Sequence, residues 1–118
     1  MNISAQLGAS VLRTMTIDLT VDPGAFHTIL PEAVAFEIGL RTFTNGPMRF
    51  DGPDVTMTVA YIRLLDREGA IPVVIQAKGP AVLGWSALQC LGLKLNDEKQ
   101  VLEHERPYGP AMLGVRNG

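Results

Sequence analysis

Apolar and polar residues alternate along the segment from Val11 to Val21, where every second position from Met15 onward is apolar and the positions between them are Thr or Asp. A period of two is typical of a strand with one buried face, so this segment is predicted to be a β-strand. It runs into Asp22-Pro23-Gly24. Proline fixes one backbone angle and glycine frees the next, so a tight turn is expected directly after the strand.

Two short stretches change from the alternating pattern to a helical one. The first follows a short predicted strand at Thr28 to Leu30 and runs from Pro31 to Gly39, with proline suited to a first helical position and glycine to a C-terminal stop. The second runs from Trp85 to Leu91 and is closed by Gly92. The first helix is predicted to be about two turns long, and both are short.

The rest of the chain is dominated by β patterns separated by turn residues. Strands are predicted at Val55–Ile62, Ile71–Ala77, Leu93–Leu95 and Val101–Glu103, with turns at Phe50–Asp54, Asp66–Gly69 and Asn96–Lys99. Two short helices among about seven short strands favour a mainly β, barrel-like domain.

Composition limits the number of domains and the kinds of partner. The chain has 118 residues, of which 47% are hydrophobic and 19% charged. These values fit one domain, predicted over residues 1–106, with residues 107–118 as a C-terminal tail that has little pattern. The net charge is −2 and the basic residues are scattered, so nucleic-acid binding is not expected. No apolar run could span a bilayer, and we predict a cytoplasmic protein without a membrane partner.

The cysteine and histidine residues argue against a disulfide and a metal site. Cys90 is the only cysteine, and His27 and His104 are the only histidines, so zinc-ligand spacing is missing. Cys90 is expected to be a small buried residue of the second helix. His27 is expected to have a structural role, and His104, between charged neighbours, is expected to be solvated.

Two blocks of sequence carry a resemblance to a known family. In the first, Asp22-Pro23-Gly24-Ala25 is followed by a short apolar strand ending in Leu30-Pro31 and by the helix that ends in Gly39-Leu40. In the second, Val82-Leu83-Gly84 leads into the helix that ends in Leu91-Gly92-Leu93. Together they resemble the retropepsin-like aspartic proteases, in which the first motif is Asp-Thr-Gly-Ala or Asp-Ser-Gly-Ala. The fold implied by this resemblance is a closed β-barrel with two short helices.

The resemblance implies that Asp22 is the catalytic residue and that Pro23, Gly24 and Ala25 form the active-site loop. The chemistry needs two carboxylates that share one proton and activate a water molecule to attack a peptide carbonyl, with no cofactor and no metal. The chain offers only one such loop, because Asp51-Gly52 and Asp66 to Gly69 lack the flanking strands. The implied enzyme is therefore a homodimer acting on a peptide or protein substrate. The hairpin around Phe50, Asp51 and Gly52 would be its flap.

Pro23 is the departure from the family pattern. In the family the residue at this position donates hydrogen bonds across the dimer axis, whereas proline has neither a hydroxyl nor an N–H. The sequence thus leaves open an impaired dimer of the same fold that serves as a peptide-binding or protein-interaction module. It also leaves open an accessory domain that docks on another protein through the tail from Tyr108 to Val115.

Overall fold

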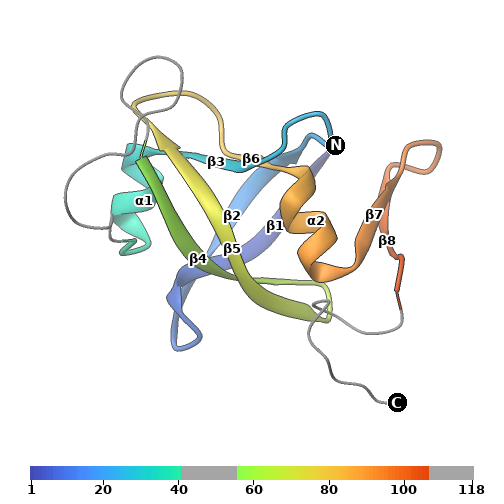
Figure 1. Cartoon of the computed structure of the whole chain (residues 1–118), viewed down its shortest axis with the longest axis horizontal. Coiled ribbons are helices and arrows are strands. Elements are labelled where there is room, and N and C mark those ends of the chain that lie inside the picture. The colour runs from blue at the N-terminus through green and yellow to red at the C-terminus, as the bar shows by residue number, and fades with distance from the viewer. Residues whose placement is uncertain (41–55, 107–118) are drawn as a thin grey trace.

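Six strands in the described part of the chain close into a barrel. The structure, a computed structural model, describes residues 1–40 and 56–106. In chain order the elements are β1 (Asn2–Ser10), β2 (Arg13–Val21), β3 (Thr28–Pro31), α1 (Glu32–Glu37), β4 (Thr56–Leu64), β5 (Arg67–Gln76), β6 (Val82–Leu83), α2 (Trp85–Leu91), β7 (Leu93–Asn96) and β8 (Val101–His104). The barrel has the order β1-β2-β6-β3-β5-β4, and β7 and β8 form a separate two-stranded sheet. The two helices lie on opposite sides of the barrel, and the β7–β8 hairpin lies beyond α2 (Figure 1).

The barrel contains both antiparallel and parallel strand pairs. The pairs β1–β2, β4–β5 and β1–β4 are antiparallel, whereas β2–β6 and β3–β5 are parallel. Short β6 is inserted between β2 and β3, parallel to the first and antiparallel to the second. Residues separated by more than half of the chain therefore meet at the end of β2, which is where the Asp22 turn begins.

The interior of the barrel is apolar because each strand turns its alternate residues inward. Leucine, isoleucine and valine fill it, and burying each such side chain stabilises the fold by roughly 1.5–3 kcal/mol. Fully or almost fully buried barrel residues are Leu7, Leu19, Leu30, Ile62, Leu64, Ile71, Val73 and Leu83. The helix α2 adds Ala87, Leu88 and Leu91 to the same core. The mainly β barrel with two short helices is thus confirmed.

Two predictions about the strands were wrong. Residues 2–10 form β1, which pairs with both β2 and β4 and so closes the barrel, although no strand was predicted there. The predicted turn at Asp66–Gly69 is instead a two-residue turn at Leu65 and Asp66, because β5 already begins at Arg67, which pairs with Leu64. Leu65 accommodates this tight turn with a left-handed φ of 57°.

A buried arginine connects the β4–β5 turn to α2 and β8. Arg67 is 6% exposed. Its guanidinium donates to the carbonyl of Leu91 at 2.9 Å and to the carbonyl of Arg106 at 2.6 Å. The first of these carbonyls belongs to the last turn of α2, where main-chain acceptors lack helical partners. The β7–β8 hairpin is therefore held in place at its C-terminal end as well as by its own ladder.

Within residues 1–40 and 56–106, no helix is long and apolar enough to cross a membrane. The predicted tail, residues 107–118, and the predicted turn at Phe50–Asp54 lie outside the described residues.

Candidate functional site

The loop that follows β2 is a β-turn that holds an exposed carboxylate. The amide of Ala25 donates to the carbonyl of Asp22 at 3.0 Å, which closes a four-residue turn with Pro23 and Gly24 at its centre. Gly24 donates its amide hydrogen to Oδ1 of Asp22 at 2.9 Å. Asp22, Pro23 and Gly24 are all exposed. The carboxylate is thus oriented by the main chain, and its second oxygen has no hydrogen-bond partner within residues 1–40 and 56–106.

Proline fits this turn because its restricted φ is the angle that the second residue of such a turn requires. The turn itself uses the amides of Gly24 and Ala25, so the missing N–H of Pro23 leaves these two hydrogen bonds intact. The φ angle of Gly24 is not positive, so the turn needs no left-handed residue at its third position. Within the chain, Pro23 is therefore compatible with an ordered loop.

Three further main-chain bonds tie the loop to β6 and α2. The amide of Asp22 donates to the carbonyl oxygen of Leu83 at 3.0 Å. In the other direction, the amide of Trp85 donates to the carbonyl oxygen of Ala25 at 2.7 Å, and the amide of Ser86 donates to that of Phe26 at 2.9 Å. The last two donors lie in the first turn of α2, where main-chain N–H groups have no helical acceptor. The start of α2 therefore fixes the loop, and the loop in turn caps the helix.

The close approach of these segments requires a glycine at position 84. A Cβ built on Gly84 would lie 2.3 Å from the carbonyl oxygen of His27 and 2.9 Å from that of Ala25. The amide of Gly84 donates to Oγ1 of Thr28 at 3.1 Å in a buried contact. Thr28 is 0% exposed, so this hydroxyl is an interior polar group with a specific partner. The resemblance had drawn attention to Gly84, whereas the role of Thr28 was not predicted.

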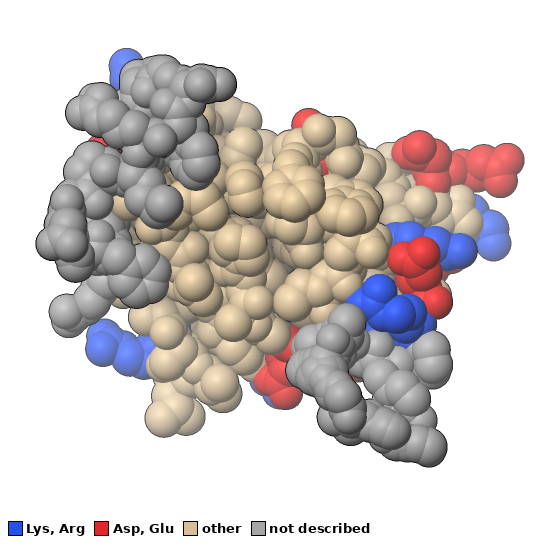
Figure 2. All heavy atoms as spheres, viewed as in Figure 1, with Lys and Arg blue, Asp and Glu red and all other residues tan. Residues whose placement is uncertain are grey.

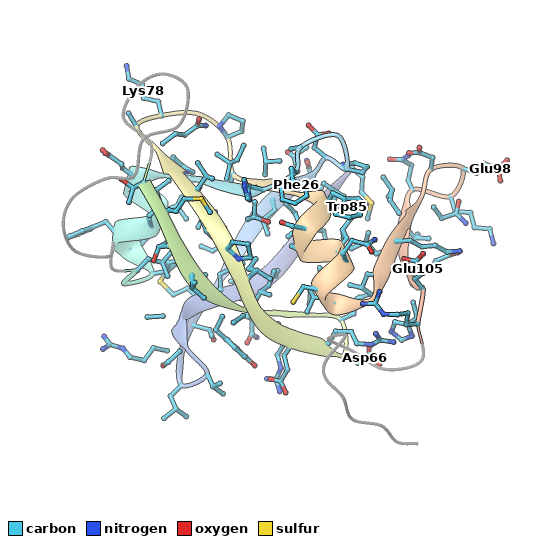
Figure 3. The ribbon with its side chains drawn as sticks, viewed as in Figure 1. Phe26, Asp66, Lys78, Trp85, Glu98 and Glu105 are labelled. Atoms are coloured by element: carbon cyan, nitrogen blue, oxygen red, sulfur yellow. The ribbon has the colours of Figure 1, made fainter. Side chains whose placement is uncertain are left out.

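An exposed aromatic pair lies beside the loop. The rings of Phe26 and Trp85 are tilted by 31° with centroids 5.6 Å apart, and the two residues are 57% and 41% exposed. Figure 3 shows them side by side at the start of α2. Trp85 therefore lies at the surface rather than in the core. Phe26 was not singled out, because one aromatic residue in a loop gives no periodic signal.

His27 lies beside Phe26. Its ring meets that of Phe26 edge to face, with centroids 4.8 Å apart. Nδ1 of His27 is buried and has no hydrogen-bond partner among the residues that the structure describes. The ring of His27 thus makes a packing contact with Phe26, but the hydrogen bonds expected of a satisfied structural histidine are not found at Nδ1 within the described residues.

The other acidic positions considered in the sequence do not join Asp22. Asp66 lies at the β4–β5 turn, below the opposite end of α2 from Phe26 and Trp85 (Figure 3). Phe50, Asp51 and Gly52, the predicted flap, lie outside the described residues. Within residues 1–40 and 56–106, the Asp22 turn is the only Asp-x-Gly loop, and it is hydrogen-bonded to β6 and α2. These residues therefore supply one carboxylate of this kind to the site.

His104 is exposed, as expected, but it also has a hydrogen-bond partner. Its Nε2 lies 2.7 Å from Oδ1 of Asp66, since β8 runs past the β4–β5 turn. This hydrogen bond lowers the pKa of Asp66 below its ordinary value of 3.8. Cys90 was expected to be buried but is only half-buried, and burial raises the pKa of its thiol above the ordinary value of 9.0.

Together, the barrel order, the turn after β2 and the insertion of β6 beside that turn define the retropepsin-like fold of aspartic proteases, and the protein has this fold. Its structure is similar to that of EIAV protease, solved in complex with the inhibitor HBY-793, with a TM-score of 0.62 and 19% sequence identity. That similarity covers 81% of this chain and 91% of the EIAV protease chain.

The retroviral protease-like domain of Ddi1 from Leishmania major is similar as well, with a TM-score of 0.59 and 14% identity over 91% of this chain and 90% of that one. No protein-family model and no curated protein sequence matches the chain. Structural similarity at such low identity establishes the fold alone, so activity has to be argued from the residues.

Proposed function

We propose that the protein is an aspartic endopeptidase that acts as a homodimer, with Asp22 of each subunit activating a water molecule for attack on a peptide carbonyl. The observation that carries the proposal is the exposed Asp22 carboxylate, oriented by the Gly24 amide within a turn that is bonded to β6 and α2. A catalytic carboxylate needs this combination of access and fixed orientation.

Homodimerisation follows from the chemistry. Two carboxylates close together cannot both be ionised, so one acts as general base and its protonated partner as general acid. One chain supplies one loop of this kind among its described residues, and a two-fold axis beside the loop would supply the other from a second copy. The mechanism requires neither a metal nor a cofactor.

One structural neighbour is a protease and the other is a protease-like domain, which supports the proposed endopeptidase activity. Pro23 is the point at which activity is most in question, because a proline cannot donate a hydrogen bond across the two-fold axis. Each hydrogen bond lost there weakens the dimer by about 0.5–1.5 kcal/mol. The loop geometry within the subunit is preserved, so we infer that the cost falls on dimer affinity rather than on the orientation of Asp22.

The decisive experiment compares the wild type with Asp22→Asn against a diverse peptide pool from acidic to neutral pH, with the oligomeric state measured at each protein concentration. Asp18→Asn is the matched control, because Asp18 is an exposed aspartate on the strand that leads into the loop. Cleavage that is lost in Asp22→Asn, retained in Asp18→Asn and dependent on dimer concentration is the expected result.

Well-formed wild-type dimers without cleavage at any pH would refute the proposal. They would favour the alternative, a dimer of the same fold that binds peptides or proteins without hydrolysing them. A protein that stays monomeric would favour the accessory-domain hypothesis.

A further inference from the structure

Phe36 is an aromatic side chain that the fold leaves in water. It lies on α1 and is 88% exposed, whereas Ala35 and Ile38 of the same segment are buried in the core. Single apolar residues on a surface are common, but a large one beside a pocket is typical of a binding site. The surroundings of Phe36 therefore decide whether it has a function.

A pocket of about 610 Å³ opens beside Phe36, between α1 and the adjoining ends of β4 and β5. Pockets of roughly 300–1,000 Å³ hold drug-sized ligands, so one aromatic ring fits easily. The lining is apolar except for Glu32 and Thr56, and it includes Ala33, Leu40, Ile75 and Ala77. An apolar ring and an apolar hollow thus lie next to each other on the surface.

The uncharged surface continues from the pocket onto the outer face of β4 and β5. Met57 and Val74 pair with each other one residue beyond the pocket, and Val59 pairs with Pro72 two residues further on. Val59 is 49% exposed. Figure 2 shows few charged side chains over these two strands, whereas red and blue side chains gather at the β7–β8 hairpin. The neighbourhood of Phe36 thus has the apolar character of the centre of a protein interface.

Phe36 and the pocket are the two halves of one contact. A two-fold axis that runs between them, in the plane of the surface, places the ring of each copy opposite the pocket of the other. The surface is therefore complementary to itself. This property favours a second copy of the chain as the occupant, because an unrelated protein would use only one of the two features.

The charges around the pocket also fit a second copy. Glu32 and Glu37 lie on α1, and Lys78 follows Ala77, which lines the pocket. Figure 3 shows Lys78 at the same end of the molecule as α1. Because both signs of charge are present, the lysine of one copy can face a glutamate of the other. A surface that attracts a strongly basic or strongly acidic partner would carry one sign of charge.

We propose that Phe36 and this pocket, which we name the α1 face, form a second interface between copies of the chain, with Phe36 of each copy inserted in the pocket of the other. α1 and α2 lie on opposite sides of the barrel (Figure 1), so the α1 face is separate from the Asp22 loop and from the two-fold axis proposed beside it. The inference goes beyond the proposed function. A copy joined at one of two separate surfaces keeps the other free, so association is expected to continue past the dimer.

The first test is the dissociation constant of the step beyond the dimer, measured by sedimentation equilibrium. Phe36→Ala is expected to raise it by about 30-fold or more, because truncation of a central interface aromatic residue costs about 2 kcal/mol or more. Leu65→Ala is the matched control. Leu65 is 54% exposed in the β4–β5 turn, at the opposite end of these strands from the α1 face, and its loss is expected to leave the constant unchanged. Urea unfolding verifies that both variants are folded.

The second test is a disulfide between two different chains, both of which also carry Cys90→Ser. One chain carries Phe36→Cys and the other Ala77→Cys, so a disulfide between positions 36 and 77 can only join two copies. Phe36 of the second chain stays in place, which keeps one of the two symmetric contacts. Oxidation of the mixture is expected to give this product in at least several-fold higher yield than a mixture in which Leu65→Cys replaces Ala77→Cys.

The outcomes separate this inference from the proposed function. A wild type that stops at the dimer and is unaffected by Phe36→Ala would overturn the α1 face as an interface while the proposed activity stood. So would a loss of stability in Phe36→Ala without a change in assembly, because Phe36 would then pack within its own chain. Assemblies that respond as expected but cleave no peptide would refute the activity and leave the second interface standing. A wild type that is monomeric at every concentration would overturn the inference outright.

Discussion

Thr28→Val removes one hydroxyl from the interior of the loop support and changes little else in shape. Oγ1 of Thr28 accepts the amide hydrogen of Gly84 at 3.1 Å, and the contact is buried. Water cannot readily replace the hydroxyl, because the segments are so close that a single Cβ on Gly84 would overlap the His27 carbonyl. The valine variant therefore leaves a buried N–H without an acceptor.

The cost follows from the desolvation of that N–H group. A buried donor left unsatisfied costs about 1–3 kcal/mol, and the added methyl group of valine offsets part of this. We expect a net loss of about 1–2 kcal/mol in the free energy of unfolding. For a domain of this size that corresponds to a fall in Tm of roughly 4–10 °C.

The assay is urea unfolding at neutral pH, followed by circular dichroism at one fixed protein concentration. Thr16→Val is the control, because Thr16 is exposed on β2 and the same chemical change there is expected to stay within about 0.5 kcal/mol of the wild type. If Thr28→Val were as stable as Thr16→Val, the hydroxyl would not be satisfying the Gly84 amide, and the account of how the loop is held would be wrong.

Three further predictions concern other contacts. Gly84→Ala is expected to destabilise the fold by about 3 kcal/mol or more in the same urea assay and to abolish any Asp22-dependent cleavage, because the new Cβ meets main-chain carbonyls; wild-type stability would contradict this. An NMR titration should place the midpoint of Asp66 below 3.8, and His104→Ala should bring it back toward that value. Because its folded-state pKa is lowered, the stability that Asp66 contributes is present above pH 3.8 and lost as the pH falls through that midpoint. Disulfide reagents should label Cys90 more slowly in the native protein than in urea, since burial raises the pKa of its thiol; equal rates would contradict this.

The parts of the fold that the sequence predicted well are those with strong local signals. The helix from Trp85 to Leu91 and its stop at Gly92, which has a left-handed φ of 69°, are as predicted. The strand at Thr28 also begins where it was predicted. In contrast, β1 was missed because Ser, Ala and Gly alternate with only a few large apolar residues there. Its pairing with β4 stabilises it, and that contact has no local signature.

In the candidate site, too, local features were predictable from the sequence and contacts between distant segments were not. The Asp22 turn and its Gly24 hydrogen bond could be expected from a short motif. The buried bond between Thr28 and Gly84 joins two segments far apart in the chain, and a threonine in a strand gives no sign of its partner. Likewise the contact of Phe26 with Trp85 follows from the way α2 meets the loop. Interactions between distant segments become visible only when the topology is known.

The bonds that hold the Asp22 turn also determine when it can form during synthesis. Its supports come from Leu83, Trp85 and Ser86, and the buried contact of Gly84 with Thr28 spans 56 residues. Contacts between such distant residues form late, because a long loop has to be closed before they stabilise anything. A nascent chain that ends before α2 therefore carries the Asp22 turn without the long-range bonds that hold it in place. These bonds form only after most of the domain has left the ribosome, which delays any activity until the barrel can close.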